Sequence, residues 1–385
     1  MNKKTKICLN AMVANEARTI TRMLESCYQY IDYWVIQDNG STDGTQDIIR
    51  NFFKEKGIPG FLYEIEWQYP GWNRDHTLQE CLKSDHGCDW ILRMDADEQL
   101  VVEDDFDWSV FDDTTVESFN ILAHAMGTKY YRTWLWNAKL PWFFQHDKRH
   151  ETIHLPEVGE NFQRVGLGEK FKHVITNDGQ TWFAPRKFLK DALELESDKV
   201  VGNTIADDLY HLWYVGKSYA DCYGNPDEFA FGKEHADEYA RRAVFYFNKF
   251  LSMTHNWSNT KKAEREDEMA YLTFILLGEA YNFMGEYEMA EEHYKYAAEF
   301  SPKRNEHLMY LAFFYDRRMR TEDALGVVET IISENKPNPF PDLCFLIEER
   351  AYLNTSNFMI EFKERLTNKL TKPVLSSESV VFSFQ

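Results

Sequence analysis

The sequence predicts an α/β domain with a mostly parallel sheet, followed by an all-α region. Two observations support this fold class. Short apolar runs alternate with helical patterns four times within about the first 100 residues, which is typical of a parallel sheet covered by helices. Beyond residue 270, small and aromatic residues recur at an interval of 34, which is typical of stacked helical pairs.

The predicted elements of the first part follow one another closely. The apolar runs predict strands over 7–14, 33–36, 61–67 and 90–94, and the intervening patterns predict helices over 19–30, 46–53 and 71–83. The next stretch, 101–115, is acidic and indicates a loop with a short helix. Residues 118–125 indicate a further strand, and the aromatic-rich stretch after it indicates either core or a wall that receives an acceptor.

The strand over 90–94 ends in three acids within four positions, Asp95, Asp97 and Glu98. Open α/β sheets bind ligands at the carboxyl ends of their strands. Because residues two apart on an extended chain point the same way, Asp95 and Asp97 would share one point in space, and two carboxylates there require a cation. A divalent ion whose shell is completed by a diphosphate meets this requirement. Taken alone, so short a pattern is more often a solvated acidic turn.

A glycine-bearing loop over 38–45 follows the second predicted strand. Its glycines allow close approach of a ligand, and the helix after it offers free N–H groups to a phosphate. Asp38 is placed to accept hydrogen bonds from a base or ribose, and Arg74 to neutralise a diphosphate. The loop is equally consistent with an ordinary turn capped at Ser41 or Thr42, and Arg74 with a surface arginine.

Taken together, these motifs resemble those of family-two glycosyltransferases with the GT-A fold. The resemblance covers about the first 100 residues and rests on Asn15-Glu16, the loop over 38–45, Asn73 and the Asp-x-Asp (DxD) motif at Asp95–Asp97. It implies a nucleotide-sugar donor, with UDP-sugar as the default, and manganese or magnesium on the diphosphate. The implied donor-binding residues are Ala14, Asn15, Glu16, Asp38, Gly40, Ser41, Asn73, Arg74 and Asp95.

Further candidates come from the stretch that follows. In a subgroup of these transferases that carries helical repeats, a His-Glu pair and a later histidine occur here, and His150-Glu151 and His173 resemble them. We expect the metal at Asp95 and Asp97, with His173 and His150 as further ligands. Inverting members of the family use one carboxylate as general base. Their usual Glu-Asp motif is not evident here, and the candidates are Glu151, which we favour, Asp147 and Glu98.

The helical region fits the tetratricopeptide pattern. The matching residues are Gly278, Tyr281, Ala290, Tyr294, Ala297 and Pro302, with Ala312, Tyr315, Ala324 and Val328 one interval later. An imperfect unit precedes them, and a helical pair and an alternating tail follow. We therefore expect a catalytic domain over 1–200, a tetratricopeptide-like solenoid over 201–340, and a helical extension with a tail over 341–385. The solenoid is equally consistent with a plain cap and with a face that selects a protein acceptor or a second subunit.

Composition narrows the partners. The net charge of −20 disfavours nucleic acid and anionic membranes. The six cysteines are scattered, which indicates free thiols in a reducing compartment. The first residues are too polar for a signal peptide, and no stretch is apolar enough for a membrane span, so we expect a cytoplasmic protein.

These observations favour a metal-dependent, inverting glycosyltransferase acting on a glycan, a lipid-linked saccharide or a protein. One alternative is an enzyme resembling sugar nucleotidyltransferases, but residues 14–18 lack the glycine-rich loop that such enzymes carry. The other is a repeat scaffold with an inactive transferase domain, against which the intact Asp-x-Asp motif argues.

Overall fold

The structure is a computed structural model that divides into two packing units. The first comprises Met1–Met269 with Asp342–Glu349, and the second comprises Ala270–Pro341 with Arg350–Gln385. The residues that it describes are 5–83, 86–113, 115–125, 128–144, 153–156, 163–176, 178–179, 186–197, 209–224, 233–254, 261–302, 304–334 and 355–371.

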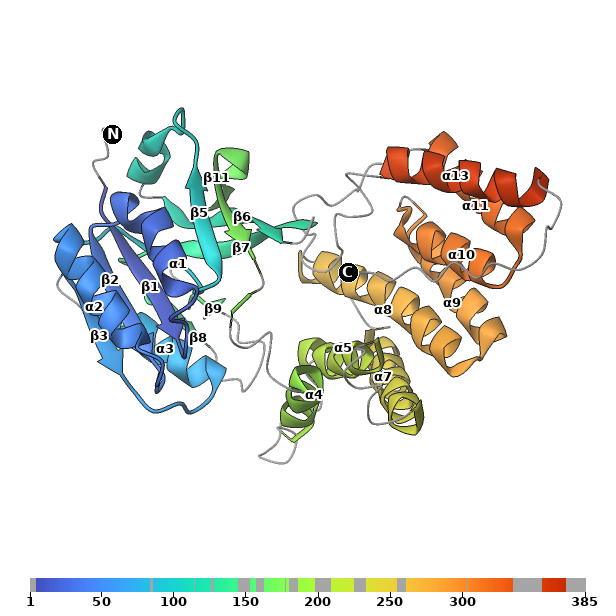
Figure 1. Ribbon diagram of the computed structural model, residues 1–385, viewed down its shortest axis with the longest axis horizontal. Helices are drawn as coiled ribbons and strands as arrows, with labels where there is room; N and C mark the ends of the chain where they lie inside the picture. Colours follow the sequence, from blue (N-terminus) through green and yellow to red (C-terminus); the bar gives the residue numbers. More distant parts are fainter. Residues whose placement is uncertain are drawn as a thin grey trace. The chain divides into compact units, whose positions relative to one another are not determined.

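A nine-stranded mixed sheet forms the centre of the first unit (Figure 1). Its order is β3-β2-β1-β4-β7-β6-β11-β5, with β10 paired to β6. The first four strands are parallel, as the sequence predicts, whereas β7 runs antiparallel to both of its neighbours. The strands are β1 (Ile7–Val13), β2 (Tyr33–Asp38), β3 (Gly60–Glu64), β4 (Trp90–Arg93), β5 (Glu98–Val102), β6 (Val116–Ala125), β7 (Thr128–Asn137), β10 (Gln163–Gly166) and β11 (Phe171–Ile175), with β8 (Phe143–Phe144) and β9 (Ile153–His154) forming a separate pair.

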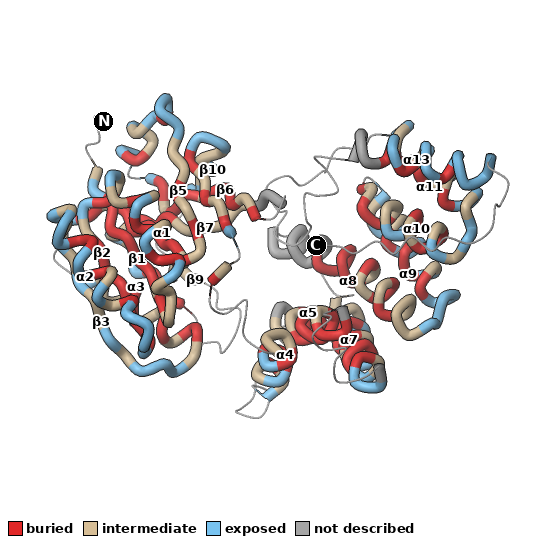
Figure 2. Tube along the Cα trace, viewed as in Figure 1, coloured by how far each residue is buried: buried red, intermediate tan, exposed pale blue. Residues whose placement is uncertain are grey.

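Helices cover both faces of the parallel strands (Figure 2). On one face, α1 (Ile20–Cys27) and α2 (Thr45–Lys56) bury Met23 and Phe53 against alternate residues of β1 such as Leu9. On the other face, α3 (Pro70–Lys83) buries Leu78 against Cys8. Burial on both faces explains why these strands are continuous apolar runs in the sequence.

The sequence predicts the strands and helices of the parallel half closely. It does not predict the strands β5, β7, β8, β9, β10 and β11. β5 follows the acidic motif, and only its last two residues fall in the stretch over 101–115 that we expected to be loop. It is ordered by antiparallel pairing with β11, which comes some 70 residues later in the chain. β3 ends at Glu64, earlier than predicted. Tight 3₁₀ turns occur over Tyr28–Tyr30, Trp108–Asp112 and Gly168–Lys170.

Three further described helices belong to the first unit, α4 (Lys187–Ser197), α5 (Leu209–Gly224) and α7 (Lys233–Thr254). Helix α4 packs on α5, and α5 packs on α7. At Gly216 the α5 backbone comes so close to α7 that an added Cβ would lie 2.8 Å from the Phe247 ring. Because α4 begins at Lys187, the helices that follow the sheet begin before residue 200. Our boundary at that position stays a prediction.

The second unit contains most of α8 (Lys261–Met284), and also α9 (Tyr287–Phe300), α10 (Glu306–Arg317), α11 (Thr321–Glu334) and α13 (Thr355–Thr371). Helices α9 and α11 have 14 residues each and begin 34 positions apart, in line with the interval in the sequence. The repeat positions Ala290, Ala312 and Val328 are fully buried. The C-terminal region is therefore helical, while its assignment to tetratricopeptide repeats stays a prediction.

Some expectations fall on other parts of the chain. Residues 342–354 and the alternating tail over 376–385 lie outside the described residues. The five described cysteines are free and buried, and Cys344 also lies outside the described part. No described helix combines the length and the apolar character needed to cross a membrane.

Candidate active site

The acidic motif lies in a turn at the carboxyl edge of the sheet. β4 ends at Arg93, and the Glu98 N–H donates to the Asp95 carbonyl at 3.1 Å, which closes the turn before β5 begins. From the sequence we expected Asp95 and Asp97 to stand on an extended chain. That expectation is wrong, because both residues lie in the turn. The apolar run does place them at the edge where such sheets bind ligands.

Arginines surround Asp95. Arg74 Nη1 donates to Asp95 Oδ1 at 3.1 Å, and Arg93 Nη2 is 3.7 Å from Oδ2. Burial alone would raise the pKa of Asp95, but the charges of Arg74, Arg93 and Arg132 outweigh it and hold the pKa well below its usual range. Asp95 thus stays ionised, and Arg74, which we expected at the diphosphate, is held beside it.

Asp97 has the opposite environment. Burial and the charge of Asp95 raise the pKa of Asp97, although the Gly179 N–H donates to its carboxylate. Within the described ranges Asp97 forms no ion pair. Its negative charge is therefore the one in this turn that a bound cation would stabilise.

Glu98 and His173 lie behind the turn. Glu98 is 1% exposed, and its carboxylate accepts from Arg132 at 2.7 Å and from the Asp95 N–H at 3.1 Å. His173 Nδ1 is 3.5 Å from Glu98 Oε2, and burial lowers the pKa of His173 to about 3, so the ring is neutral. This placement favours a supporting role for Glu98 over that of a base in contact with an acceptor.

Trp134 holds two arginines of this cluster. Its ring lies 4.1 Å from the Arg93 guanidinium and 4.2 Å from that of Arg132. Such contacts fix the planar groups that lie beside Asp95 and Glu98. In the part of the chain that the structure describes, no three His, Cys, Asp or Glu side chains form a group able to hold a metal ion. Asp95, Asp97 and His173 as metal ligands therefore stay predictions, and the fourth expected ligand, His150, lies outside the described residues.

Asp38 ends β2 and is fully buried. Its Oδ1 accepts from the Gly40 N–H at 3.1 Å, the Ser41 N–H at 2.8 Å and Gln46 Nε2 at 2.9 Å. Its Oδ2 is buried and has no hydrogen-bond partner among the described residues. A buried carboxylate oxygen without a donor is costly, so this atom is poised to accept one.

The loops after β1 and β2 are joined because these strands pair in parallel, with Val13 opposite Asp38. The Asn15 N–H donates to Ser41 Oγ at 2.7 Å, and Asn15 Oδ1 accepts from the Thr42 N–H at 2.8 Å. Asn15 takes a left-handed conformation to do so, with φ of 57°. Ala14, Asn15 and Glu16 thus lie beside the loop over 38–45, and their contact with a donor stays a prediction.

Asn73 has an internal role in the structure. Its Oδ1 accepts from the N–H groups of Gln68 and Tyr69 at 2.9 and 3.1 Å, and its Nδ2 donates to Asn39 Oδ1 at 2.8 Å. The side chain is fully buried, so it positions the start of α3 and the loop after β2. Direct contact of Asn73 with a donor stays a prediction.

The remaining candidates divide into two groups. Asp147, His150 and Glu151 lie outside the described residues. In the aromatic stretch, Trp136, Trp142 and Phe144 are buried in the core, whereas Phe143 is 40% exposed and stacks on His154 at 5.4 Å. Sequence reasoning missed Arg93, Arg132, Asp178 and Gly179, since isolated arginines, aspartates and glycines carry no signal before the register of the strands is known.

Comparisons with known proteins give one family. Residues 12–105 match the family model described as glycosyl transferase family 2. The crystal structure of S. aureus TarS 1-349 is similar with a TM-score of 0.38 and 13% identity, over 76% of this chain and 91% of that one. Another crystal structure of S. aureus TarS gives 0.40 and 14%, over 75% of this chain and 55% of that one. No curated protein matches the chain significantly.

The family match runs from the end of β1 through β5, the segment that carries Asp38, Asp95 and Asp97. The mixed α/β sheet followed by helices is the architecture that a GT-A transferase with a helical C-terminal region requires. The match and the fold together, rather than the weak structural likenesses, show that the protein is a glycosyltransferase in which residues 12–105 are similar to glycosyl transferase family 2.

Proposed function

We propose that this glycosyltransferase is an inverting, metal-dependent enzyme that uses a UDP-sugar. The observation that carries the proposal is Asp97, a partly buried carboxylate with a raised pKa and no ion pair in the described part of the chain, at the carboxyl edge of the sheet. A site of this kind gains stability when a cation with phosphate ligands binds.

The donor would bind across the loops after β1 and β2. Asp38 Oδ2 lacks a donor, and a base or ribose would supply an N–H or O–H there. Helix α2 begins at Thr45, whose N–H donates to Asp43 Oδ1 at 3.1 Å, and the next N–H groups of its first turn would suit a phosphate. UDP is the default nucleotide by the resemblance of the loop to family-two transferases.

Manganese or magnesium fits the residues present. Asp97 and Asp95 would hold it, and the donor diphosphate and water would complete its shell, since such ions commonly take only one or two carboxylates from the protein. When bound, the ion would offset charge on the leaving diphosphate. Arg74, on α3, is placed to act beside it, because its contact with Asp95 already brings its guanidinium to the turn.

The residues that we propose to act on the acceptor are named from the sequence alone. Glu151 is our candidate for the general base, with Asp147 second, and the base would take a proton from the acceptor hydroxyl as the sugar is transferred. We propose that the C-terminal helices select a protein or peptide acceptor, or a second subunit. Buried free cysteines fit a reducing compartment, and we therefore keep the cytoplasm as the proposed location.

A donor screen tests this proposal. Thermal unfolding of wild type and Asp97→Ala would be followed with UDP, GDP, CMP and dTDP, each with and without manganese. We expect UDP with manganese to raise the unfolding temperature, because a ligand that binds only the native state stabilises it by mass action. The manganese-dependent part should vanish in Asp97→Ala and persist in the control Asp105→Asn, whose exposed carboxylate bonds Lys170. If another nucleotide raises the unfolding temperature instead, that nucleotide replaces UDP in the proposal. If no nucleotide raises it, the proposal is rejected.

A further inference from the structure

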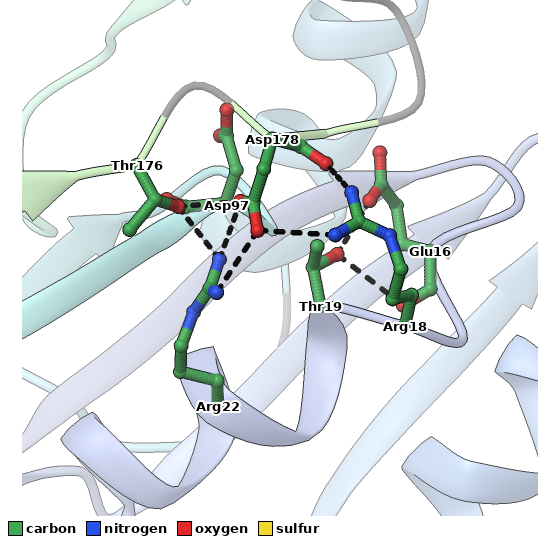
Figure 3. A network of polar contacts seen from close by, with 7 residues as sticks. All are labelled: Glu16, Arg18, Thr19, Arg22, Asp97, Thr176 and Asp178. Carbon is green, nitrogen blue, oxygen red and sulfur yellow. Dashed lines mark hydrogen bonds and ion pairs between the residues drawn. The ribbon is translucent and has the colours of Figure 1, made fainter. Parts of the chain in front are cut away.

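Two described residues just after β11, Thr176 and Asp178, are tied to the start of α1 by two arginines (Figure 3). Arg22 grips both oxygens of Asp178, with Nη1 donating to Oδ2 at 3.0 Å and Nη2 donating to Oδ1 at 2.6 Å. Arg18 Nη1 donates to Oδ2 at 3.2 Å, and its Nη2 donates to the Asp178 carbonyl. We call Arg18, Arg22 and Asp178 the arginine clamp.

The arginine clamp has a defined geometry. Two parallel N–H···O bonds between a guanidinium and a carboxylate fix the relative orientation of both groups. The hydrogen bond from Arg22 holds the pKa of Asp178 well below its usual range, so the carboxylate is charged whenever the protein is folded near neutral pH. Because partly exposed ion pairs contribute little to the free energy of folding, what the clamp supplies is position.

Thr176 and Gly179, the neighbours of Asp178 in the chain, contact Asp97 at two places. The Thr176 N–H donates to the Asp97 carbonyl at 3.1 Å, and Thr176 Oγ1 is 2.9 Å from the same oxygen. The Gly179 N–H donates to the Asp97 carboxylate. A Cβ at Gly179 would lie 3.3 Å from Asp97 Oδ2 and 3.4 Å from Glu16 Oε1, so both carboxylates meet the bare backbone of this residue. The backbone and the side chain of Asp97 thus both depend on the segment that Asp178 secures.

We propose that Asp178 is a positioning residue for glycosyl transfer, which acts through Arg22, Thr176 and Gly179 to hold Asp97 in place for the cation and diphosphate of the donor. This inference rests on the proposed function. It adds that the loop after β1, which borders the nucleotide, and the turn after β4, which borders the diphosphate, are joined by a clamp already formed in the free protein.

Binding of UDP tests the inference, with and without manganese, by calorimetric titration of wild type, Asp178→Asn and the control Asp105→Asn. We expect Asp178→Asn to bind UDP alone as wild type does, because Asp38 is untouched. The gain in UDP affinity on adding manganese should be about tenfold smaller in Asp178→Asn than in wild type, which corresponds to one misplaced ligand. The control also removes one carboxylate charge from an exposed ion pair and should keep the full manganese effect.

Hydrogen exchange adds a readout that needs no ligand. In the free protein, amides over 171–179 should exchange faster in Asp178→Asn than in wild type, and those of β1 should not change. If Asp178→Asn keeps both the manganese effect and the slow exchange, the inference is overturned while the metal site stands. If wild type itself shows no manganese effect, the proposed metal site fails and the inference with it.

Two milder variants guard against a folding defect in Asp178→Asn. Arg22→Lys keeps the charge but cannot form the two-point contact, and we expect a smaller loss of the manganese effect. Gly179→Ala leaves the clamp intact and places a methyl group against both carboxylates, and it should weaken manganese-dependent binding alone. If Arg22→Lys and Gly179→Ala both fold and both keep the full gain in UDP affinity on adding manganese, the inference is also overturned.

Discussion

Asp38 and Asp43 lie in the same loop and differ in what their oxygens contact. Asp43 Oδ1 accepts from the Thr45 N–H at 3.1 Å within the same loop, and Oδ2 accepts from the Ala17 N–H at 3.0 Å, which joins this loop to the one after β1. Asp38 Oδ1 accepts hydrogen bonds from the loop, whereas Oδ2 is buried and has no partner among the described residues. The sequence identifies both as loop acids, and only their contacts separate a structural acid from one that is ready for a ligand.

This difference yields a prediction for single substitutions. Asp38→Asn should weaken UDP binding about 10- to 100-fold, the effect of losing a hydrogen bond to a charged group. Asp43→Asn should lower the unfolding temperature instead, because it weakens hydrogen bonds that join the loops. Titration with UDP and thermal unfolding of both variants separate the two effects. Equal loss of affinity in both variants would contradict this assignment of roles.

The acidic turn shows what residue types alone predict. Three acids after an apolar run pointed to Asp95, Asp97 and Glu98 together, and the structure places all three at one corner of the sheet. Their environments differ: arginines neutralise Asp95, Glu98 is enclosed with Arg132, and Asp97 lacks an ion pair within the described ranges. These differences arise from Arg93 on β4 and Arg132 on β7, which come together only through the antiparallel pairing of those strands.

At the scale of elements, two glycines in the helical region occupy contrasting places. Gly278 of α8 is buried, and a Cβ there would lie 2.5 Å from the ring of Tyr294, itself fully buried in α9. Gly326 of α11 has nothing within 4 Å of the same point. The small residue is thus required at the first position, where two helices touch, and not at the second.

We therefore expect opposite effects from the same substitution. Gly278→Ala should destabilise the helical unit by about 1–2 kcal/mol, since overpacking costs more than the helix propensity of alanine returns. Gly326→Ala should stabilise it by about 0.5–1 kcal/mol, because alanine loses less backbone entropy than glycine on folding. Urea unfolding followed by far-ultraviolet circular dichroism measures both. A gain of stability in Gly278→Ala would show that the two helices pack less closely than described.

On the scale of the whole molecule, the chain divides into two packing units whose boundary falls inside helix α8. Unfolding units that have separate cores respond separately to changes made in only one of them. The proposed nucleotide site lies in the first unit, and Gly278 lies in the second.

Calorimetry of the full chain should therefore resolve two transitions. UDP with manganese should raise the transition of the first unit, and Gly278→Ala should lower that of the second, each leaving the other nearly unchanged. A single transition that moves under both treatments would show that the units unfold together. Asp105→Asn serves as the matched substitution that should move neither transition appreciably.

The sequence by itself determined the parallel half of the sheet, the helical character of the C-terminal region and the transferase motifs. The physical reason is that periodicity, glycine placement and strand-end acids are local properties of the chain. Only the tertiary structure decided that β5 is a strand, that His173 is enclosed behind Glu98, and that Asp178 is bound to α1. Each of these depends on residues more than 60 positions apart, whose contacts follow from strand register and packing rather than from any local pattern.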